Sequence, residues 1–292
     1  MDCMDNVDSM YSMDNVDNKN IIYLGKITEI DPIKTFECGQ CFRWNADASG
    51  GYIGVVRGMP ARVWAEGGDV FLYSADAGSS NYEMWRDYFA LDVDYGAIDF
   101  SGVTSEYFDA CRSFGEGIRI LRQEKWEVLC SFIISQCNNI PRIKGIVEAL
   151  CREFGQPVSL DGMQMYTFPS AEAVAALSAE DLAVIRSGYR ARYILDAARA
   201  VSAGETELEA LAKVSRRDAL AGLLKLNGVG VKVANCVLLF GLGHMSGFPV
   251  DVWMKRALTA HFPKDFNPDS FGEYAGLAQQ YIFYYAREHG EA

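Results

Sequence analysis

Between residues 21 and 91 the chain alternates short apolar runs with turn residues. The runs have the length of strands and lie at 21–27, 41–44, 52–57, 61–65 and 70–73. Glycines at 50–51, 58 and 67–68 separate several of them. A helical spacing of apolar residues follows at 81–91. This part of the chain therefore predicts an antiparallel β-sheet with few helices.

After Gly102 the apolar residues recur with the helical period, near i, i+3, i+4 and i+7. Helices are predicted at 118–136, 140–154, 179–187, 191–203, 205–212, 216–224, 231–242, 252–261 and 270–289. The predicted fold class is α+β, with an N-terminal antiparallel sheet domain at 21–103 and a mostly α-helical domain at 104–292. Residues 1–20 hold five aspartates without apolar periodicity and are expected to be a disordered acidic leader.

Composition restricts the class of protein. Half of the 292 residues are hydrophobic, and the net charge of −12 argues against a general nucleic-acid binder. Arginine and lysine nevertheless gather in the second half, so a local basic face is possible. The apolar runs are too short for a membrane span and no secretory signal precedes them, so we expect a soluble, intracellular monomer with no membrane partner.

Cysteine spacing favours free thiols. Eight cysteines include one C-x-x-C pair, Cys38 and Cys41, and no second pair lies at zinc-ligand spacing. The cysteines at 111, 130, 137 and 151 do not form a tight cluster, and no cysteine follows Cys236. We therefore expect no required cofactor and no iron–sulfur cluster.

The most informative stretch is Leu226–Lys232, followed nineteen residues later by Asp251. Gly228 and Gly230 are expected to form a tight turn with positive φ between two helices, which leaves backbone N–H groups free to bind a phosphate. Lys232 lies on the first helical turn, where the helix dipole disfavours the protonated amine. On these residues alone the stretch could equally be a plain αα-hairpin, Lys232 a solvated amine and Asp251 a helix N-cap.

Five motifs in order resemble one family. They are Gly39–Trp44, Phe132–Arg142, Gly188–Tyr193, Gly228–Ala234 and Pro249–Val252. Together they resemble the 8-oxoguanine DNA glycosylases of the helix-hairpin-helix, Gly/Pro…Asp superfamily, over residues 21–289. The resemblance implies a DNA N-glycosylase with abasic-site lyase activity. Such an enzyme extrudes an oxidised guanine paired with cytosine from duplex DNA before removing it.

The resemblance assigns roles to individual residues. Lys232 would attack the sugar and form an imine, and Asp251 would stabilise the cationic sugar. The remaining residues fall into four groups. The base would be read by Gly39, Gln279, Phe283 and Cys236; the wedge and the orphaned cytosine would involve Cys137, Asn138, Arg142, Tyr189 and Arg190; phosphate would bind at Gly228, Gly230, Lys232 and Trp253; and carbonyls of Leu224, Leu226 and Val229 would hold a structural cation.

Three positions depart from the family pattern, and the mildest is Phe240, which stands where a methionine is common and changes only the packing. Cys137 stands where an asparagine is usual, and a thiol cannot supply the hydrogen bonds of an amide. Trp253 stands where a histidine is frequent, which would change a phosphate contact to an indole N–H. Two other functions remain open: a monofunctional alkylpurine glycosylase, which would not need Lys232, and a non-catalytic helix-hairpin-helix module, which would need neither Lys232 nor Asp251.

Overall fold

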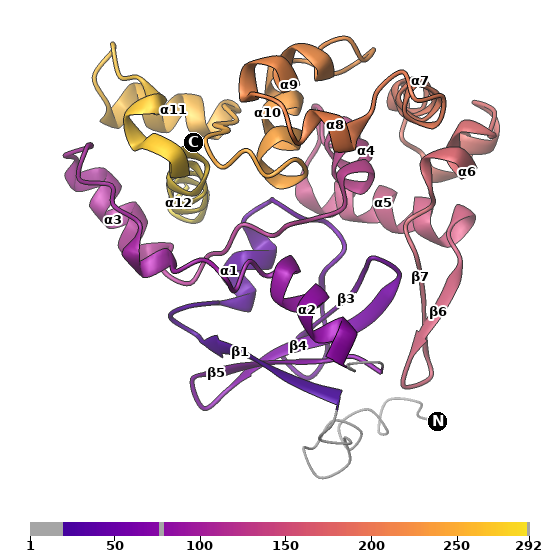
Figure 1. Cartoon of the computed structure of the whole chain (residues 1–292), viewed down its shortest axis with the longest axis horizontal. Helices are drawn as coiled ribbons and strands as arrows, with labels where there is room; N and C mark the ends of the chain where they lie inside the picture. Colours follow the sequence, from indigo (N-terminus) through magenta and orange to yellow (C-terminus); the bar gives the residue numbers. More distant parts are fainter. Residues whose placement is uncertain (1–19, 76–78, 291–292) are drawn as a thin grey trace.

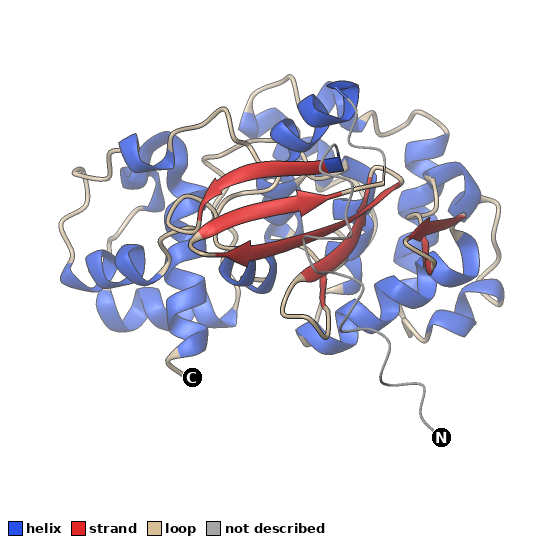
Figure 2. Ribbon diagram, turned by 90° about the horizontal axis from the view of Figure 1, so that it is seen from below, coloured by secondary structure: helices blue, strands red, loops and turns tan. Residues whose placement is uncertain are grey.

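The structure is a computed structural model that describes residues 20–75 and 79–290, and the expected acidic leader lies almost wholly outside these residues. Five strands form one antiparallel sheet in the order β1-β5-β4-β3-β2. Their bounds are β1 Ile21–Lys26, β2 Asn45–Ala46, β3 Tyr52–Val56, β4 Met59–Glu66 and β5 Asp69–Tyr73. The sheet confirms the expected α+β class, and Figure 2 shows it lying across the helical part of the molecule.

Two helices pack with the sheet, α1 (Pro32–Glu37) and α2 (Ser79–Tyr88). Aromatic side chains fill the space between these helices and the strands. Trp44 stacks on Phe36 with a centroid distance of 4.5 Å and donates its indole N–H to the Tyr88 hydroxyl at 2.8 Å. The sheet half therefore has its own buried core.

The second part of the chain is a layer of helices above the sheet in Figure 1. Its helices are α3 Glu106–Phe114, α4 Lys125–Ile134, α5 Ile140–Phe154, α6 Ala171–Ala175, α7 Arg190–Ser202, α8 Leu208–Leu211, α9 Arg216–Leu223, α10 Val231–Phe240, α11 Val252–His261 and α12 Ala275–Glu288. The 3₁₀ helices are η2 Tyr95–Ala97, η3 Asp181–Ile185 and η4 Pro268–Tyr274. Among the described helices none has the length and apolar composition needed to cross a membrane.

The sequence missed several elements besides the 3₁₀ helix η2. They are α1, α3, α6 and a β-hairpin made of β6 (Pro157–Leu160) and β7 (Met163–Tyr166). The helix expected at 179–187 is the shorter η3, and the helix expected at 270–289 is divided at Gly272, whose φ of 71° is not helical. The two shortest of these helices, α1 and α6, have six and five residues and are too short to show a helical period.

Two predicted elements were wrong for a physical reason. Residues 41–44 form no strand, because the strand that pairs with β3 begins at Asn45. The helix predicted at 118–136 begins only at Lys125. Residues 118–123 form no regular element, and a side chain from the sheet half binds their backbone groups: Gln40 donates to the Arg119 carbonyl at 2.7 Å and accepts from the Leu121 N–H at 2.9 Å.

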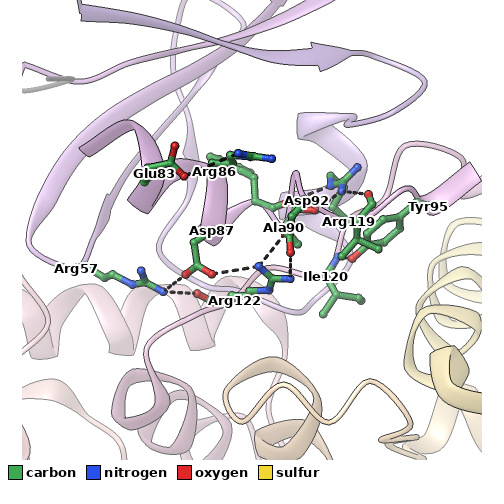
Figure 3. Close-up of polar contacts among 12 residues, drawn as sticks. Arg57, Glu83, Arg86, Asp87, Ala90, Asp92, Tyr95, Arg119, Ile120 and Arg122 are labelled. Carbon is green, nitrogen blue, oxygen red and sulfur yellow. Dashed lines mark hydrogen bonds and ion pairs between the residues drawn. The ribbon is translucent and has the colours of Figure 1, made fainter. Parts of the chain in front are cut away.

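Arg119 joins the two halves of the molecule (Figure 3). Its buried guanidinium donates to the carbonyls of Phe89 at 2.8 Å, Glu29 at 3.2 Å and Val93 at 2.7 Å, and also to that of Ala90. The same group lies 4.2 Å from the centre of the Tyr95 ring. These contacts hold the segment before α4 against the residues that follow α2.

Candidate functional site

The hairpin between α9 and α10 depends on glycine at one position. Gly228 has a φ of 79°, and a Cβ there would lie 2.2 Å from Cγ of Tyr193. Gly230 differs from the expectation: its φ of −89° is ordinary, it faces open space, and it is the N-cap of α10. Only Gly228 therefore needs the left-handed conformation.

The N-terminus of α10 is open. Gly230 offers no side chain to cap the helix, and Val231 in the first turn is 61% exposed. The first N–H groups of an α-helix have no partner within the helix. Asn227 donates to an Asp196 carboxylate oxygen at 2.7 Å, which ties the hairpin to α7. An exposed helix N-terminus on a fixed hairpin is suited to a phosphate.

Lys232 turns inward from this helix start. Its Nζ lies 3.4 Å from Oγ of Ser135 and 5.2 Å from the centre of the Phe132 ring. The Ser135 hydroxyl donates to the Phe132 carbonyl at 2.8 Å, so its lone pairs remain available to the amine. Ser135 and Phe132 belong to a motif singled out in the sequence, but their contact with Lys232 was not foreseen.

Asp251 begins α11 and caps it. Its Oδ1 accepts the Met254 N–H at 2.9 Å, which confirms the capping interpretation. The same side chain also lines a cavity together with Lys232, so capping leaves it close to the amine. Within the described part of the chain Lys232 and Asp251 form no direct ion pair.

The cavity has a volume of about 40 Å³ and draws its walls from distant parts of the chain. Its lining residues are Cys38, Gly39, Phe132, Lys232, Cys236, Phe240, Pro249, Asp251, Gln279, Gln280 and Phe283. Space of this size holds a few waters, since one water needs about 10–15 Å³. A purine base is much larger, so its entry requires the walls to separate.

The four expected base-reading residues lie together in these walls. Gly39 has a φ of 77°, and a Cβ there would lie 3.2 Å from the Phe283 ring. Gln279, buried on α12, accepts a hydrogen bond from Gln280 at 2.8 Å. Burial raises the pKa of the Cys236 thiol to about 11, so this cysteine is a neutral wall of the cavity. Gln280 was missed, although two adjacent amides in an apolar helix are a visible signal.

Close packing of two helices brings α12 to the cavity. At Gly276 a Cβ would lie 2.2 Å from Cδ1 of Leu239 on α10, and the Gly276 N–H donates to the Met245 carbonyl at 2.8 Å. Glycine therefore permits the contact that places Gln279 and Phe283 beside the residues of α10.

The expected wedge residues lie outside the cavity. Tyr189 is 56% exposed and Cys137 is an exposed free thiol with a φ of 47°. Arg142 is exposed, while Asn138 donates to the Ile134 carbonyl at 3.2 Å. The exposed members are therefore accessible to a large ligand.

Arg190 differs from the exposed residues expected at the wedge and the orphaned cytosine, because it is only 4% exposed. Its guanidinium donates to the carbonyls of Gln136 at 2.8 Å, Cys137 at 3.1 Å and Ser187 at 3.3 Å. The loop that carries Cys137 is thus held by Arg190. Reading a cytosine would require Arg190 to share or exchange these bonds, so that role stays a prediction.

The other expected contacts lie on nearby surfaces. Trp253 is partly exposed in the first turn of α11. The Leu226 carbonyl accepts the Val229 N–H at 3.1 Å and keeps one lone pair for a cation. No group of three or more His, Cys, Asp or Glu side chains suited to a metal occurs in the described residues. A cation here would therefore depend on backbone carbonyls.

Family models match the chain in two consecutive parts. The 8-oxoguanine DNA glycosylase N-terminal domain matches residues 22–129, and the HhH-GPD superfamily base excision DNA repair protein model matches residues 130–270. The chain is 30% identical to an N-glycosylase/DNA lyase OGG1 from Arabidopsis thaliana, a match that covers 88% of this chain and 77% of that protein.

Two solved structures are similar over almost the whole chain. MBOgg1 in complex with a low-affinity DNA ligand is 40% identical with a TM-score of 0.87, covering 94% of this chain and 98% of that one. A Clostridium acetobutylicum 8-oxoguanine glycosylase/lyase, in complex with double-stranded DNA containing cytosine opposite 8-oxoguanine, is 34% identical with a TM-score of 0.83. That match covers 90% of this chain and 93% of the other.

Proposed function

Because the chain belongs to the 8-oxoguanine DNA glycosylase family of the HhH-GPD superfamily, we propose that it excises 8-oxoguanine opposite cytosine from duplex DNA and then cleaves the strand. The observation that carries this proposal is one cavity lined by both an amine and a carboxylate, Lys232 and Asp251. The cavity lies beside the open N-terminus of α10, where a DNA phosphate can bind.

Lys232 is the proposed nucleophile. The neutral amine nitrogen forms a bond to the sugar carbon C1′ while the bond from C1′ to the base breaks, and the base leaves with the bonding electron pair. Loss of a nitrogen-bound proton and opening of the sugar ring leave an imine between Lys232 and C1′. The imine acidifies the C2′ proton, whose removal expels the 3′ phosphate and nicks the strand.

Asp251 is proposed to stabilise the positive charge that the sugar gains as the base leaves. A carboxylate fixed before the reaction needs no reorganisation at the transition state. The hydrogen bond from the Met254 N–H supports such fixation, because it holds one oxygen while the other can face the sugar.

We propose that this chemistry needs no cofactor, since the amine and the carboxylate supply the nucleophile and the charge. A cation at the carbonyls of Leu224, Leu226 and Val229 would support phosphate binding only. We further propose that the protein acts as a monomer on the DNA of the cell. The exposed residues around the hairpin, among them Val231 and Tyr189, support a DNA-binding face.

The test is an 8-oxoguanine:cytosine duplex with and without borohydride. Wild type should nick the strand and form a covalent adduct with DNA under reduction, and Lys232→Gln should form no adduct. Lys26→Gln is the matched control, since Lys26 is exposed on β1 and pairs with Asp69 at 2.6 Å. Trapping by Lys232→Gln would refute the nucleophile, base release without nicking would indicate the monofunctional alternative, and binding alone would indicate a non-catalytic module.

A further inference from the structure

Gln280 presents an unsatisfied acceptor in the cavity walls. It is 3% exposed on α12, and its Nε2 donates to Oε1 of Gln279 at 2.8 Å. Its own Oε1 is buried and accepts no hydrogen bond from the residues that the structure describes. Both glutamines line the cavity that contains Lys232.

A buried amide oxygen without a donor is unfavourable, and such groups in folded proteins usually have a partner. Within the described residues no group provides one to Gln280. Because Gln280 lines the cavity, a donor on a ligand that widens the cavity can reach this oxygen. The hydrogen bond between the two glutamines also restricts Gln279: with one lone pair of its oxygen occupied, its two Nε2 protons are left for a ligand acceptor.

These two features match the pairing edge of guanine. That edge has a carbonyl oxygen, O6, which accepts, and an exocyclic amine, N2, which donates. A base with adenine's edge has an amine in place of O6, and hypoxanthine lacks the N2 amine. The pair of glutamines therefore offers a donor and an acceptor to neighbouring atoms of a guanine-type base.

We propose that Gln280 is a second base-reading residue, whose Oε1 accepts an N2–H of the extruded oxidised guanine while its Nε2–H holds Gln279 for donation to O6. This inference rests on the proposed function. It assigns to Gln280 the selection of guanine-type bases over oxidised purines that lack the 2-amino group. It assigns no part to Gln280 in separating oxidised from normal guanine, since both carry that amine.

The test compares 8-oxoguanine with 8-oxohypoxanthine, each opposite cytosine, by single-turnover excision. These bases differ only at the 2-amino group. Wild type should excise 8-oxoguanine about tenfold faster than 8-oxohypoxanthine, because one hydrogen bond has an effect of about this size. Gln280→Met loses the hold on Gln279 for both bases, but it loses the acceptor for N2–H only for 8-oxoguanine. It should therefore slow 8-oxoguanine more than 8-oxohypoxanthine, so the preference falls to about threefold or less. Equal loss on both bases, or no loss on either, would overturn the proposal.

Gln280→Glu tests the acceptor separately, because it keeps an oxygen at nearly the same position. Its preference for 8-oxoguanine should stay within about threefold of wild type; a loss like that of Gln280→Met would refute the acceptor role. If Gln280→Met does not fold, equal rates of wild type on the two bases would still refute the inference.

An abasic-site duplex separates this inference from the proposed function. Such DNA has no base to read, so Gln280→Met should form the borohydride adduct at the wild-type rate. Slow trapping by that variant would indicate a disturbed cavity and overturn the specific reading role. If wild type neither excises nor traps, the proposed function fails and this inference fails with it; normal trapping with an unchanged base preference in Gln280→Met refutes the inference alone.

Discussion

Gly228 lies against Tyr193 so closely that a Cβ on the glycine would be 2.2 Å from the ring carbon Cγ. The hairpin that precedes Lys232 is therefore held against α7 by an aromatic ring as well as by the Asn227–Asp196 hydrogen bond. This contact makes the two glycines of the hairpin unequal, although they look alike in the sequence.

We expect Gly228→Ala to destabilise the protein by at least about 2 kcal/mol. The alanine would have to adopt the left-handed backbone conformation of Gly228, and its Cβ would overpack against the Tyr193 ring. It should also lower adduct formation with damaged DNA. Gly230→Ala is the matched control, since its φ of −89° and open surroundings accept a methyl group, and alanine at this N-cap costs only about 0.5–1 kcal/mol. Urea unfolding measures both, and equal losses would contradict the assignment of strain to Gly228.

Asp251 serves a helix and, as proposed, the reaction, and two substitutions separate these roles. Asn caps a helix about as well as Asp, so Asp251→Asn should change stability by less than about 0.5 kcal/mol. Its excision rate should nevertheless fall at least about 100-fold, because the charge facing the sugar is removed. Asp251→Ala should lose the rate and about 1 kcal/mol of stability. A normal excision rate for Asp251→Asn would remove Asp251 from the mechanism.

Cys137 is the exposed thiol among the described cysteines, whereas Cys38, Cys41, Cys111, Cys130, Cys151 and Cys236 are buried. We expect it to react rapidly with a thiol reagent under native conditions, and the fast phase should shrink by one thiol in Cys137→Ser. Duplex DNA containing an abasic-site analogue should protect it if the wedge assignment holds. Unchanged labelling in the presence of saturating DNA would place Cys137 outside the DNA interface.

Glu127 should make stability depend on pH. Burial raises the pKa of this carboxyl to about 7, although Arg43 at 3.8 Å opposes the shift. The folded state therefore binds this proton more tightly than the unfolded state. The resulting stability is present below the unfolded pKa, which is about 4.3, and is lost as the pH rises through about 7.

We expect Glu127→Gln to remove this loss, so its stability relative to wild type should rise by on the order of 2–3 kcal/mol between pH 4.5 and 7.5. Urea unfolding at several pH values measures the difference. Lys26→Gln, on the exposed face of β1, controls for a general effect of pH. Parallel pH profiles of wild type and Glu127→Gln would show that Glu127 does not carry the dependence.

The sequence predicted the regular helices of the second half well, because their apolar spacing extends over several turns. Residues 140–154 and 252–261 were predicted with the bounds that the structure has. The segment 118–123 was wrong because its backbone partners, such as Gln40, lie about 80 residues away, where no local pattern can reveal them.

In the candidate site, too, some residues could be predicted from the sequence and some contacts could not. Lys232 and Asp251 were recognisable from short motifs, since helix starts have a local signature. The contact of Ser135 with Lys232 and the free oxygen of Gln280 depend on how α4, α10 and α12 pack together. Such contacts between distant elements leave only a faint trace in a single sequence.

The hydrogen bonds of Gln40 make the unfolding of the sheet half and of the helical half depend on each other. The buried amide of this residue bonds to both sides of the junction, and its neighbour Gly39 forms part of the cavity wall. Loosening the junction would therefore deform the cavity and separate the two cores at the same time. The protein should accordingly lose its ability to bind a damaged base and its resistance to denaturant in a single transition, and separately expressed halves should not restore activity when mixed.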